Sequence, residues 1–201
     1  MDAQEWDRRY ADGGLLWAAE PNRFVAETFA GVPAGRALDL AAGEGRNAIW
    51  LAGQGWQVTA VDFSAVAIGK GRAWAERQGY EVDWRVADVL SYDPPRGGFD
   101  AVIVAYLHLM PDDFAAALDT AASAVTAGGL LLVVGHDVSN IQHGTGGPQD
   151  PAVLYTPETV RARLDGWEIR RAERARRPVA TDAGEVEAID TVVVALRPAS
   201  G

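Results

Sequence analysis

Two glycines follow the first expected strand of the chain, in a segment whose residues are suited to binding a ligand. The segment Leu38-Asp39-Leu40-Ala41-Ala42-Gly43-Glu44-Gly45-Arg46-Asn47 joins a short apolar run to a helical one. Gly43 and Gly45 allow the backbone to turn sharply and to approach a ligand without an intervening Cβ. The helix start beyond them, around Asn47, offers free N–H groups to a negative group. This turn is therefore a candidate ligand-binding loop.

Two acidic residues close the next two expected strands. Asp62 ends the second strand, about 20 residues after Gly43, where an acid can accept hydrogen bonds from both hydroxyls of a ribose. Asp88 ends the third strand beside Val89, where an adenine ring would lie if Asp62 held the ribose. The structural alternatives are a helix cap beside Ser64 for Asp62 and an ordinary loop acid for Asp88.

Three histidines are the candidates for acid–base chemistry. His108 follows the fourth expected strand and His136 the fifth, at the sheet edge where α/β proteins bind ligands. His143 lies in a long loop, and the spacing of the three matches no metal motif, so no metal site is expected. A neutral imidazole is available near pH 7, which makes His108 and His136 the candidate bases. The alternative is a polar lining without a chemical role.

Composition excludes several classes of function. The 201 residues carry a net charge of −10 and include no cysteine, which excludes disulfides, thiolate metal sites and a cysteine nucleophile. An acidic surface repels phosphate backbones, so a small molecule rather than a nucleic acid is the expected partner. The arginines between 170 and 177 are expected to form a solvated edge.

The apolar runs are short. Ala101–Ala105 and Leu130–Val134 are far below the roughly 20 residues that span a bilayer, so no membrane partner is expected. The N-terminus has no basic region followed by an apolar run, which predicts a cytoplasmic protein. The sequence gives no indication of the oligomeric state.

The elements that must position these residues alternate along the chain. Strands are expected over residues 36–42, 56–61, 80–87, 99–105 and 130–135, with helices between them, including one from Ser64 to Gly79 and one from Pro111 to Gly128-Gly129. Residues 167–175 and 186–196 form two further strands with no helix between them. The sequence therefore predicts an α/β fold with a doubly wound, mostly parallel seven-stranded sheet and a C-terminal antiparallel hairpin.

The spacing of Asp39, Gly43, Gly45, Asp62 and Asp88-Val89 resembles the motif series of class I S-adenosylmethionine-dependent methyltransferases. Gly45-Arg46-Asn47 and the residues after it are similar to the tellurite-resistance and thiopurine methyltransferase-like branch. The resemblance implies S-adenosylmethionine as cofactor and S-adenosylhomocysteine as product. It implies a Rossmann-like methyltransferase fold.

The resemblance also implies roles for single residues. Backbone at Ala41 and Gly43 would face the methionine part of the cofactor, with Asp39 beneath it, and Asp62 would hold the ribose. Around the adenine, the implied contacts come from Phe63, the Asp88 carboxylate and the Val89 N–H. Ala105, after the fourth strand, would line the same cleft. Gly45 and Asn47 complete the cofactor loop.

The segments flanking the expected cleft are candidates for closing it. Residues 1–35 are expected to form a helical lid segment before a methyltransferase domain over 36–201. Its aromatics, including Tyr10 and Trp17, would cover the cofactor or alternatively staple a helix to the core, and Arg23 would meet a carboxylate. The polar, glycine-rich loop from His136 to Leu154 is expected to shape the acceptor pocket.

The expected function is methyl transfer to an oxygen, nitrogen, sulfur or other soft atom of a small molecule. Gly43-x-Gly45-x-x-Ala48 also satisfies the dinucleotide fingerprint, so a nicotinamide-dependent oxidoreductase is the main alternative. Asp39 would then face a pyrophosphate, which like charge disfavours. A cofactor-binding protein without turnover is a further alternative.

Overall fold

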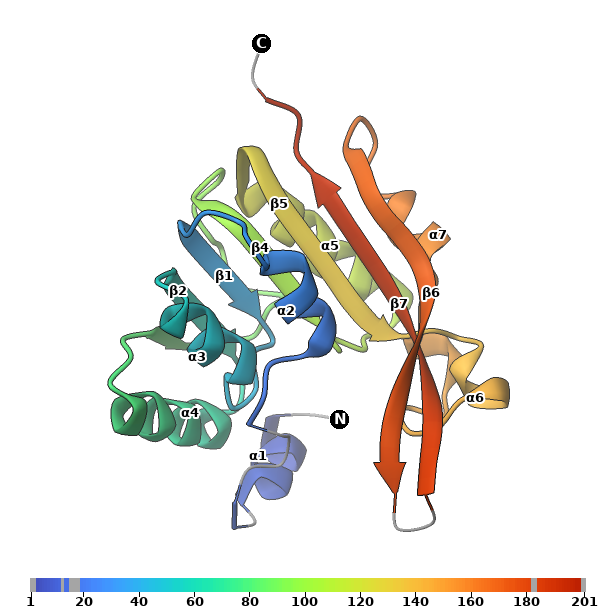
Figure 1. Cartoon of the computed structure of the whole chain (residues 1–201), viewed down its shortest axis with the longest axis horizontal. Coiled ribbons are helices and arrows are strands. Elements are labelled where there is room, and N and C mark those ends of the chain that lie inside the picture. The colour runs from blue at the N-terminus through green and yellow to red at the C-terminus, as the bar shows by residue number, and fades with distance from the viewer. Residues whose placement is uncertain (1–2, 12, 15–18, 182–183, 200–201) are drawn as a thin grey trace.

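The computed structural model describes residues 3–11, 13–14, 19–181 and 184–199. Its centre is a seven-stranded sheet with the order β3-β2-β1-β4-β5-β7-β6 (Figure 1). The strands are β1 Arg36–Leu40, β2 Gln57–Asp62, β3 Asp83–Val86, β4 Phe99–Ala105, β5 Val125–His136, β6 Glu168–Thr181 and β7 Gly184–Leu196. The helices are α1 Ala3–Ala11, α2 Arg23–Phe29, α3 Arg46–Gly53, α4 Ala65–Gln78, α5 Pro111–Ala124, α6 Asn140–His143 and α7 Pro157–Arg161, with a 3₁₀ turn at Pro151–Val153.

The pairing of the strands confirms the predicted fold. β2, β1, β4 and β5 run parallel, with β3 parallel to β2. β7 pairs antiparallel with both β5 and β6. The two C-terminal strands therefore form the expected hairpin, and β7 is inserted between β5 and the edge strand β6.

The predicted end of the fifth helix is wrong. The helix expected to reach Gly128-Gly129 ends at Ala124, and β5 already begins at Val125. Val125 pairs with Phe99, and pairing resumes between Leu130 and Ala101. The two glycines therefore lie in an irregular part of the strand instead of ending a helix. Val125 is buried and β-branched, a residue type that favours a strand.

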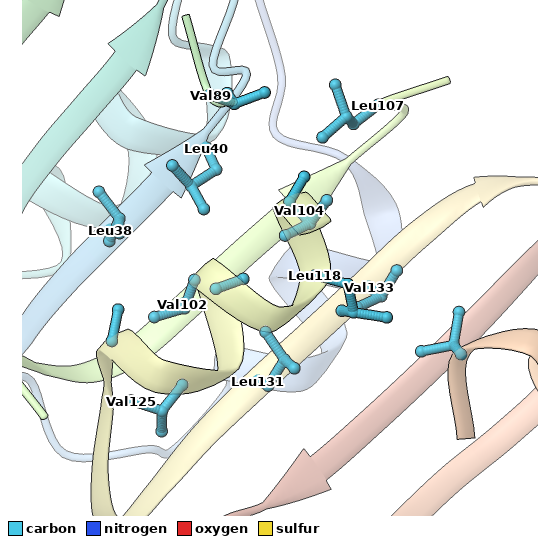
Figure 2. Packing of buried hydrophobic residues seen from close by; sticks show 14 of the residues in the cluster. Leu38, Leu40, Val89, Val102, Val104, Leu107, Leu118, Val125, Leu131 and Val133 are labelled. Carbon is cyan, nitrogen blue, oxygen red and sulfur yellow. The ribbon is translucent and has the colours of Figure 1, made fainter. Parts of the chain in front are cut away.

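Helices cover both faces of the sheet, and the two cores follow the alternation of the strands. Leu38 and Leu40 of β1 face α5, together with Val102 and Val104 of β4 (Figure 2). On the other face α2 and α3 pack on Ala37 and its neighbours. Both faces of the central strands are buried, which is typical of a parallel sheet.

The parallel strands bring their carboxyl ends to one edge of the sheet. Leu40 pairs with Val61 of β2 and with Val104 of β4, and Ala105 pairs with Val134 of β5. The residues that follow these strands therefore lie next to one another. α1 and the outer half of the β6–β7 hairpin lie beyond the same edge in Figure 1. Within the described ranges, no helix is long and apolar enough to cross a membrane.

Candidate active site

The loop after β1 turns through left-handed backbone at three positions. Ala41 has φ 60°, Gly43 φ 57° and Gly45 φ 77°. A Cβ at Gly43 would lie 2.8 Å from the hydroxyl of Tyr10, and a Cβ at Gly45 would lie 2.2 Å from the ring of Trp84. Glycine is therefore required at both positions, by conformation and by close approach. Alanine is a non-glycine residue in this conformation, and such backbone strain clusters at binding sites.

Asp39 lies in β1 beneath this loop, with only 1% of its surface exposed. Among the described residues, neither of its carboxylate oxygens has a hydrogen-bond partner. Burial raises its pKa to about 7, and the nearby Asp62 adds to the effect, while Arg46 and the backbone N–H of Ala48, which lies too far away or at too poor an angle for a full hydrogen bond, oppose it. A buried acid without a donor is costly in a folded chain, so this position is suited to a ligand that brings a donor.

Asp62 ends β2 and connects it to the glycine loop. Its Oδ2 accepts from the Gly43 N–H at 2.8 Å, and its Oδ1 accepts from the Ser64 N–H at 2.9 Å. Burial raises its pKa. The structural alternative is partly correct, since Asp62 supports Ser64, which caps α4 at Ala67. Each oxygen keeps an acceptor site, so the ribose hypothesis stays a prediction.

The expected adenine contacts lie at the same edge. Asp88 is exposed, and its Oδ1 accepts from the Leu90 N–H at 2.9 Å, in a tight turn after β3. Val89 is buried at 8% exposure, whereas Phe63 is half-buried between β2 and α4. The structure brings these residues to one end of the sheet, beside Asp62. Their contacts with an adenine stay predictions.

The N-terminal helix α1 lies against the glycine loop and α4. Tyr10 is buried, and its hydroxyl points at Gly43. Lys70 of α4 donates to the Tyr10 carbonyl at 2.6 Å, and the Ser64 hydroxyl donates to Asp7. The predicted aromatic cover is therefore tied to the cofactor loop through Tyr10.

Two other N-terminal predictions have different outcomes. Trp17 lies outside the described residues. Arg23 is the first residue of α2, and its guanidinium pairs with Glu27 at 2.5 Å on the surface. That ion pair competes with the carboxylate contact predicted for Arg23.

The second half of the site follows β4. Ala105 is half-buried, and Tyr106 after it has φ 57°. The Tyr106 hydroxyl donates to Asp190 Oδ2 at 2.9 Å and accepts from the Asn22 side chain at 3.2 Å. The Asn22 N–H in turn donates to the Asn47 side chain at 2.8 Å. Asn47 therefore holds the start of α2 in place, a role that its predicted contact with the cofactor did not include.

A buried carboxylate lies at the centre of this half. Asp190 of β7 is fully buried, and Arg177 Nε lies 2.8 Å from its Oδ2. His136 Nδ1 lies 3.2 Å from its Oδ1. Burial alone would raise the pKa of Asp190, but the contacts with His136 and Arg177 lower it below its usual value. Asp190 is therefore a stable anion beside the His136 imidazole, at a contact of 3.2 Å that does not have hydrogen-bond geometry.

The two candidate bases differ in their surroundings. His108 is half-buried, and its Nε2 accepts from the backbone N–H of His136 at 3.1 Å. Burial lowers the pKa of His108 to about 4. The two rings stack with centroids 5.5 Å apart. Because its Nε2 lone pair is already used, His108 is better suited to positioning His136 than to the predicted role of a base.

The loop after β5 is ordered by its own polar groups. Asn140 is buried, its Oδ1 accepts from the Ile189 N–H at 2.7 Å, and its amide donates to the Thr145 and Gly146 carbonyls. A Cβ at Gly147 would lie 2.4 Å from the His136 ring. The loop therefore packs on His136, and Asn140 holds the loop together. Its part in an acceptor pocket stays a prediction.

Sequence reasoning missed Tyr106, Arg177 and Asp190. The arginines of β6 were expected to be a solvated edge, but that prediction is wrong for Arg177, which pairs with Asp190 inside the site. Arg174 likewise reaches the buried Asp137 at 3.1 Å. Side chains alternate between the two faces along a strand, so Ala175 and Arg177 lie on the same face of β6. This pattern was the signal in the sequence that could have separated Arg177 from the solvated arginines.

A hollow of about 910 Å³ lies elsewhere. It is near the amino ends of β1 and β2 and is lined by Arg36, Gln57, Tyr80 and Trp84 among others. It holds neither the glycine loop nor the histidines, so its size does not identify the site. Among the described residues no group of three histidine, aspartate or glutamate side chains is arranged to hold a metal ion.

Comparisons with known proteins agree with this geometry. Residues 37–129 match a family described as a methyltransferase domain. Over 101 residues the chain is 36% identical to a demethylmenaquinone methyltransferase of Thermus thermophilus, covering 49% of this chain and 46% of that protein. The match therefore spans about half the length of this curated relative.

Solved structures share the fold over nearly the whole chain. The N-methyltransferase NodS of Bradyrhizobium japonicum, solved with S-adenosyl-L-homocysteine, has a TM-score of 0.74 at 16% identity, covering 98% of both chains. TehB of Haemophilus influenzae has a TM-score of 0.74 at 13% identity, covering 97% of this chain and 66% of TehB. At these identities the likeness concerns the fold.

Proposed function

We propose that this chain is a class I methyltransferase that transfers a methyl group from S-adenosylmethionine to a small-molecule acceptor, and the match of residues 37–129 to a methyltransferase domain supports this. The acceptor's lone pair forms a bond to the methyl carbon as the sulfur–methyl bond breaks. The sulfur keeps the electron pair of the broken sulfur–methyl bond, and S-adenosylhomocysteine leaves. The donor is already activated, so orientation of the two reactants and exclusion of water supply most of the rate.

One observation carries the proposal, namely the buried Asp39 without a donor beneath a glycine loop that tolerates no side chain. An amino-acid ammonium group satisfies such a carboxylate, whereas a pyrophosphate is repelled by it. This favours a methionine-bearing cofactor over a nicotinamide dinucleotide. When bound, the cofactor supplies the electrophilic methyl group, and the chain's own residues hold and orient it.

In the donor half we propose backbone contacts from Ala41, Gly43 and Gly45, and a ribose contact from Asp62. The fused rings of the adenine would lie by Phe63, Asp88 and Val89, and Ala105 would line the same cleft. The lid comprises residues of the 1–35 segment, and its proposed closing residue is Tyr10, which already reaches Gly43. Residues 36–201 then form the methyltransferase domain.

In the acceptor half we propose that His136 removes the acceptor's proton where one must leave. With Nδ1 turned to Asp190 at 3.2 Å, a proton on Nδ1 leaves Nε2 as the basic nitrogen. The buried anion stabilises the imidazolium that forms. His108 holds the His136 backbone and positions the ring.

The partner class and location complete the proposal. The net charge of −10 favours a small molecule over a nucleic acid. We propose a cytoplasmic location.

Thermal unfolding with two ligands tests the proposal. S-adenosylhomocysteine at about 100 times its dissociation constant should add about 2.7 kcal/mol to the free energy of unfolding and raise the melting temperature. Reduced nicotinamide dinucleotide should leave it unchanged. A shift with the dinucleotide and none with saturating S-adenosylhomocysteine would overturn the proposal in favour of an oxidoreductase.

A further inference from the structure

The outer part of the β6–β7 hairpin extends past the edge of the sheet where the candidate site lies. The ladder between β5 and β7 ends at His136↔Asp190, whereas β6 and β7 stay paired as far as Thr181↔Gly184. Figure 1 shows this part of the hairpin beyond the strand ends, at the edge where α1 also lies. Residues 176–181 and 184–189 are called the hairpin arm below. The function proposed above gives this arm no role.

The strand register places three residue pairs of the hairpin on one face. Residues directly opposite each other in an antiparallel ladder share a face, and every second pair returns to that face. On Asp190, the Oδ2 atom accepts from the Tyr106 hydroxyl, and Oδ1 contacts His136. The face that carries Asp190 is therefore the site face, and along the arm it continues the acceptor half of the site outward. Its three pairs are Ala175↔Asp190, Arg177↔Ala188 and Val179↔Val186.

The two faces of the arm differ in charge. On the opposite face, Arg176 Nη1 lies 2.6 Å from Glu187 Oε2. On the site face, Arg177 is turned back to Asp190, with its Nε 2.8 Å from Oδ2, so its charge is balanced there. The next pair outward consists of two valines. The site face therefore changes from paired charges to apolar side chains with distance from Asp190.

The valine pair is accessible to a ligand. Val186 is 38% exposed and Val179 is half-buried. Among the described residues, neither valine belongs to the two core clusters that hold the sheet and its helices together. Strand formation alone does not require valine here, because threonine is also favoured in strands and suits an exposed face. Two apolar side chains opposite each other gain free energy when an apolar group of a ligand covers them.

The spacing along the strand limits the shape of a molecule that could use both regions. Val186 precedes Asp190 by four residues on β7, a separation of about 13 Å at about 3.4 Å per residue. A compact polar molecule held beside His136 would not reach the valines. An elongated molecule with an apolar far end would reach them.

We propose that Val179 and Val186 form an apolar subsite for the methyl acceptor. The acceptor is then an elongated molecule with its nucleophilic group at His136 and an uncharged, apolar group on the hairpin arm. This inference rests on the proposed function, because it takes His136 to mark the reacting end of the acceptor. A charged group at the far end is disfavoured, since the valines offer it no hydrogen-bond partner.

Calorimetric titration with two phenols tests the subsite. The full chain is saturated with S-adenosylhomocysteine and titrated with phenol and with 4-pentylphenol, which adds an apolar chain to the same nucleophilic group. The parent is compared with Val186→Thr and with the double variant Val179→Thr/Val186→Thr, because threonine keeps the β-branched shape. Val86→Thr is the matched control, since Val86 is a strand valine, 56% exposed, on the opposite edge strand β3. Thermal unfolding reports whether each variant folds, and sedimentation of the parent and the double variant reports their oligomeric state.

The parent should bind 4-pentylphenol at least about tenfold more tightly than phenol, because each methylene group removed from water adds to the affinity. Val186→Thr should reduce this ratio of affinities about threefold to fivefold, and the double variant should remove most of it. Val86→Thr should keep the ratio of the parent. Every variant should bind S-adenosylhomocysteine within about twofold of the parent, since the substitutions lie outside the proposed donor half.

Three results would overturn the subsite. The first is a parent that binds 4-pentylphenol no more tightly than phenol, or binds neither. The second is a parent-like ratio in the double variant, which would place the pentyl chain elsewhere on the protein. The third is a parent dimer that the double variant dissociates, which would assign the valines to a contact between two copies. Failure of the parent to bind S-adenosylhomocysteine would instead contradict the proposed function, so the two failures are distinguishable.

Discussion

Replacement of Asp39 by asparagine should make the ligand-free protein more stable at alkaline pH. The carboxylate is buried without a donor, and burial raises its pKa from 3.8 to about 7. The folded protein therefore holds a proton that the unfolded chain releases between these two values. The free energy of unfolding of the parent therefore falls as pH rises from about 4 to about 7.

The magnitude follows from the size of this shift. A rise of about 3 pH units corresponds to about 4 kcal/mol of destabilisation once Asp39 is ionised in the folded state. A buried asparagine without a partner costs about 1–3 kcal/mol. Asp39→Asn should therefore gain about 1–3 kcal/mol above about pH 8, and should lie close to the parent near pH 5.

Urea unfolding of both proteins near pH 5 and pH 8 measures the effect. The stability of Asp39→Asn relative to the parent should improve by about 2–3 kcal/mol between the two conditions. Asp190→Asn is the control, and its stability relative to the parent should not improve between the two pH values. The reason is that pairing lowers the pKa of Asp190 and its charge stabilises the folded state. A relative stability of Asp39→Asn that does not change with pH, or that falls, would refute the account of Asp39 as an unsatisfied acid.

Three further substitutions test other parts of the site. Asp62→Asn should weaken S-adenosylhomocysteine by about 1–3 kcal/mol in a titration, and parent-like affinity would reduce Asp62 to its support of Gly43 and Ser64. His136→Gln should lower kcat about 100-fold or more with little change in S-adenosylhomocysteine affinity, whereas equal losses in both would place His136 in the donor half. Gly147→Ala should raise KM for the acceptor and destabilise the fold by about 1–3 kcal/mol, because residue 147 has φ 74° and packs on the His136 ring. Unfolding and kinetics equal to those of the parent would show that the loop accommodates the added methyl group without cost.

The elements with strong local signals could be predicted from the sequence. Ser64 and Gly79 mark the two ends of α4, because a hydroxyl cap and a left-handed glycine act within one turn of the helix. The strand at Phe99–Ala105 follows from a continuous apolar run. The third strand was predicted too long, because the Tyr80 N–H donates to the Ala75 carbonyl and so belongs to the end of α4.

The acceptor half could be predicted only in part, because its contacts join distant parts of the chain. His136 was identified from its place after a strand, but Asp190 and Tyr106 are separated by 84 residues. No local pattern pairs an aspartate inside a strand with a tyrosine that follows another. The long loop after His136 was correctly placed, whereas the burial of Asn140 depends on the Ile189 backbone and could not be anticipated.

The most direct test of the central claim is mass spectrometry of a small-molecule extract incubated with the protein and methyl-deuterated S-adenosylmethionine. The account predicts a product that carries the labelled methyl group, together with S-adenosylhomocysteine, and predicts that both decrease sharply with His136→Gln and with Asp62→Asn. Saturable donor binding with no labelled product in any fraction would contradict it and would identify the chain as a cofactor-binding protein without turnover.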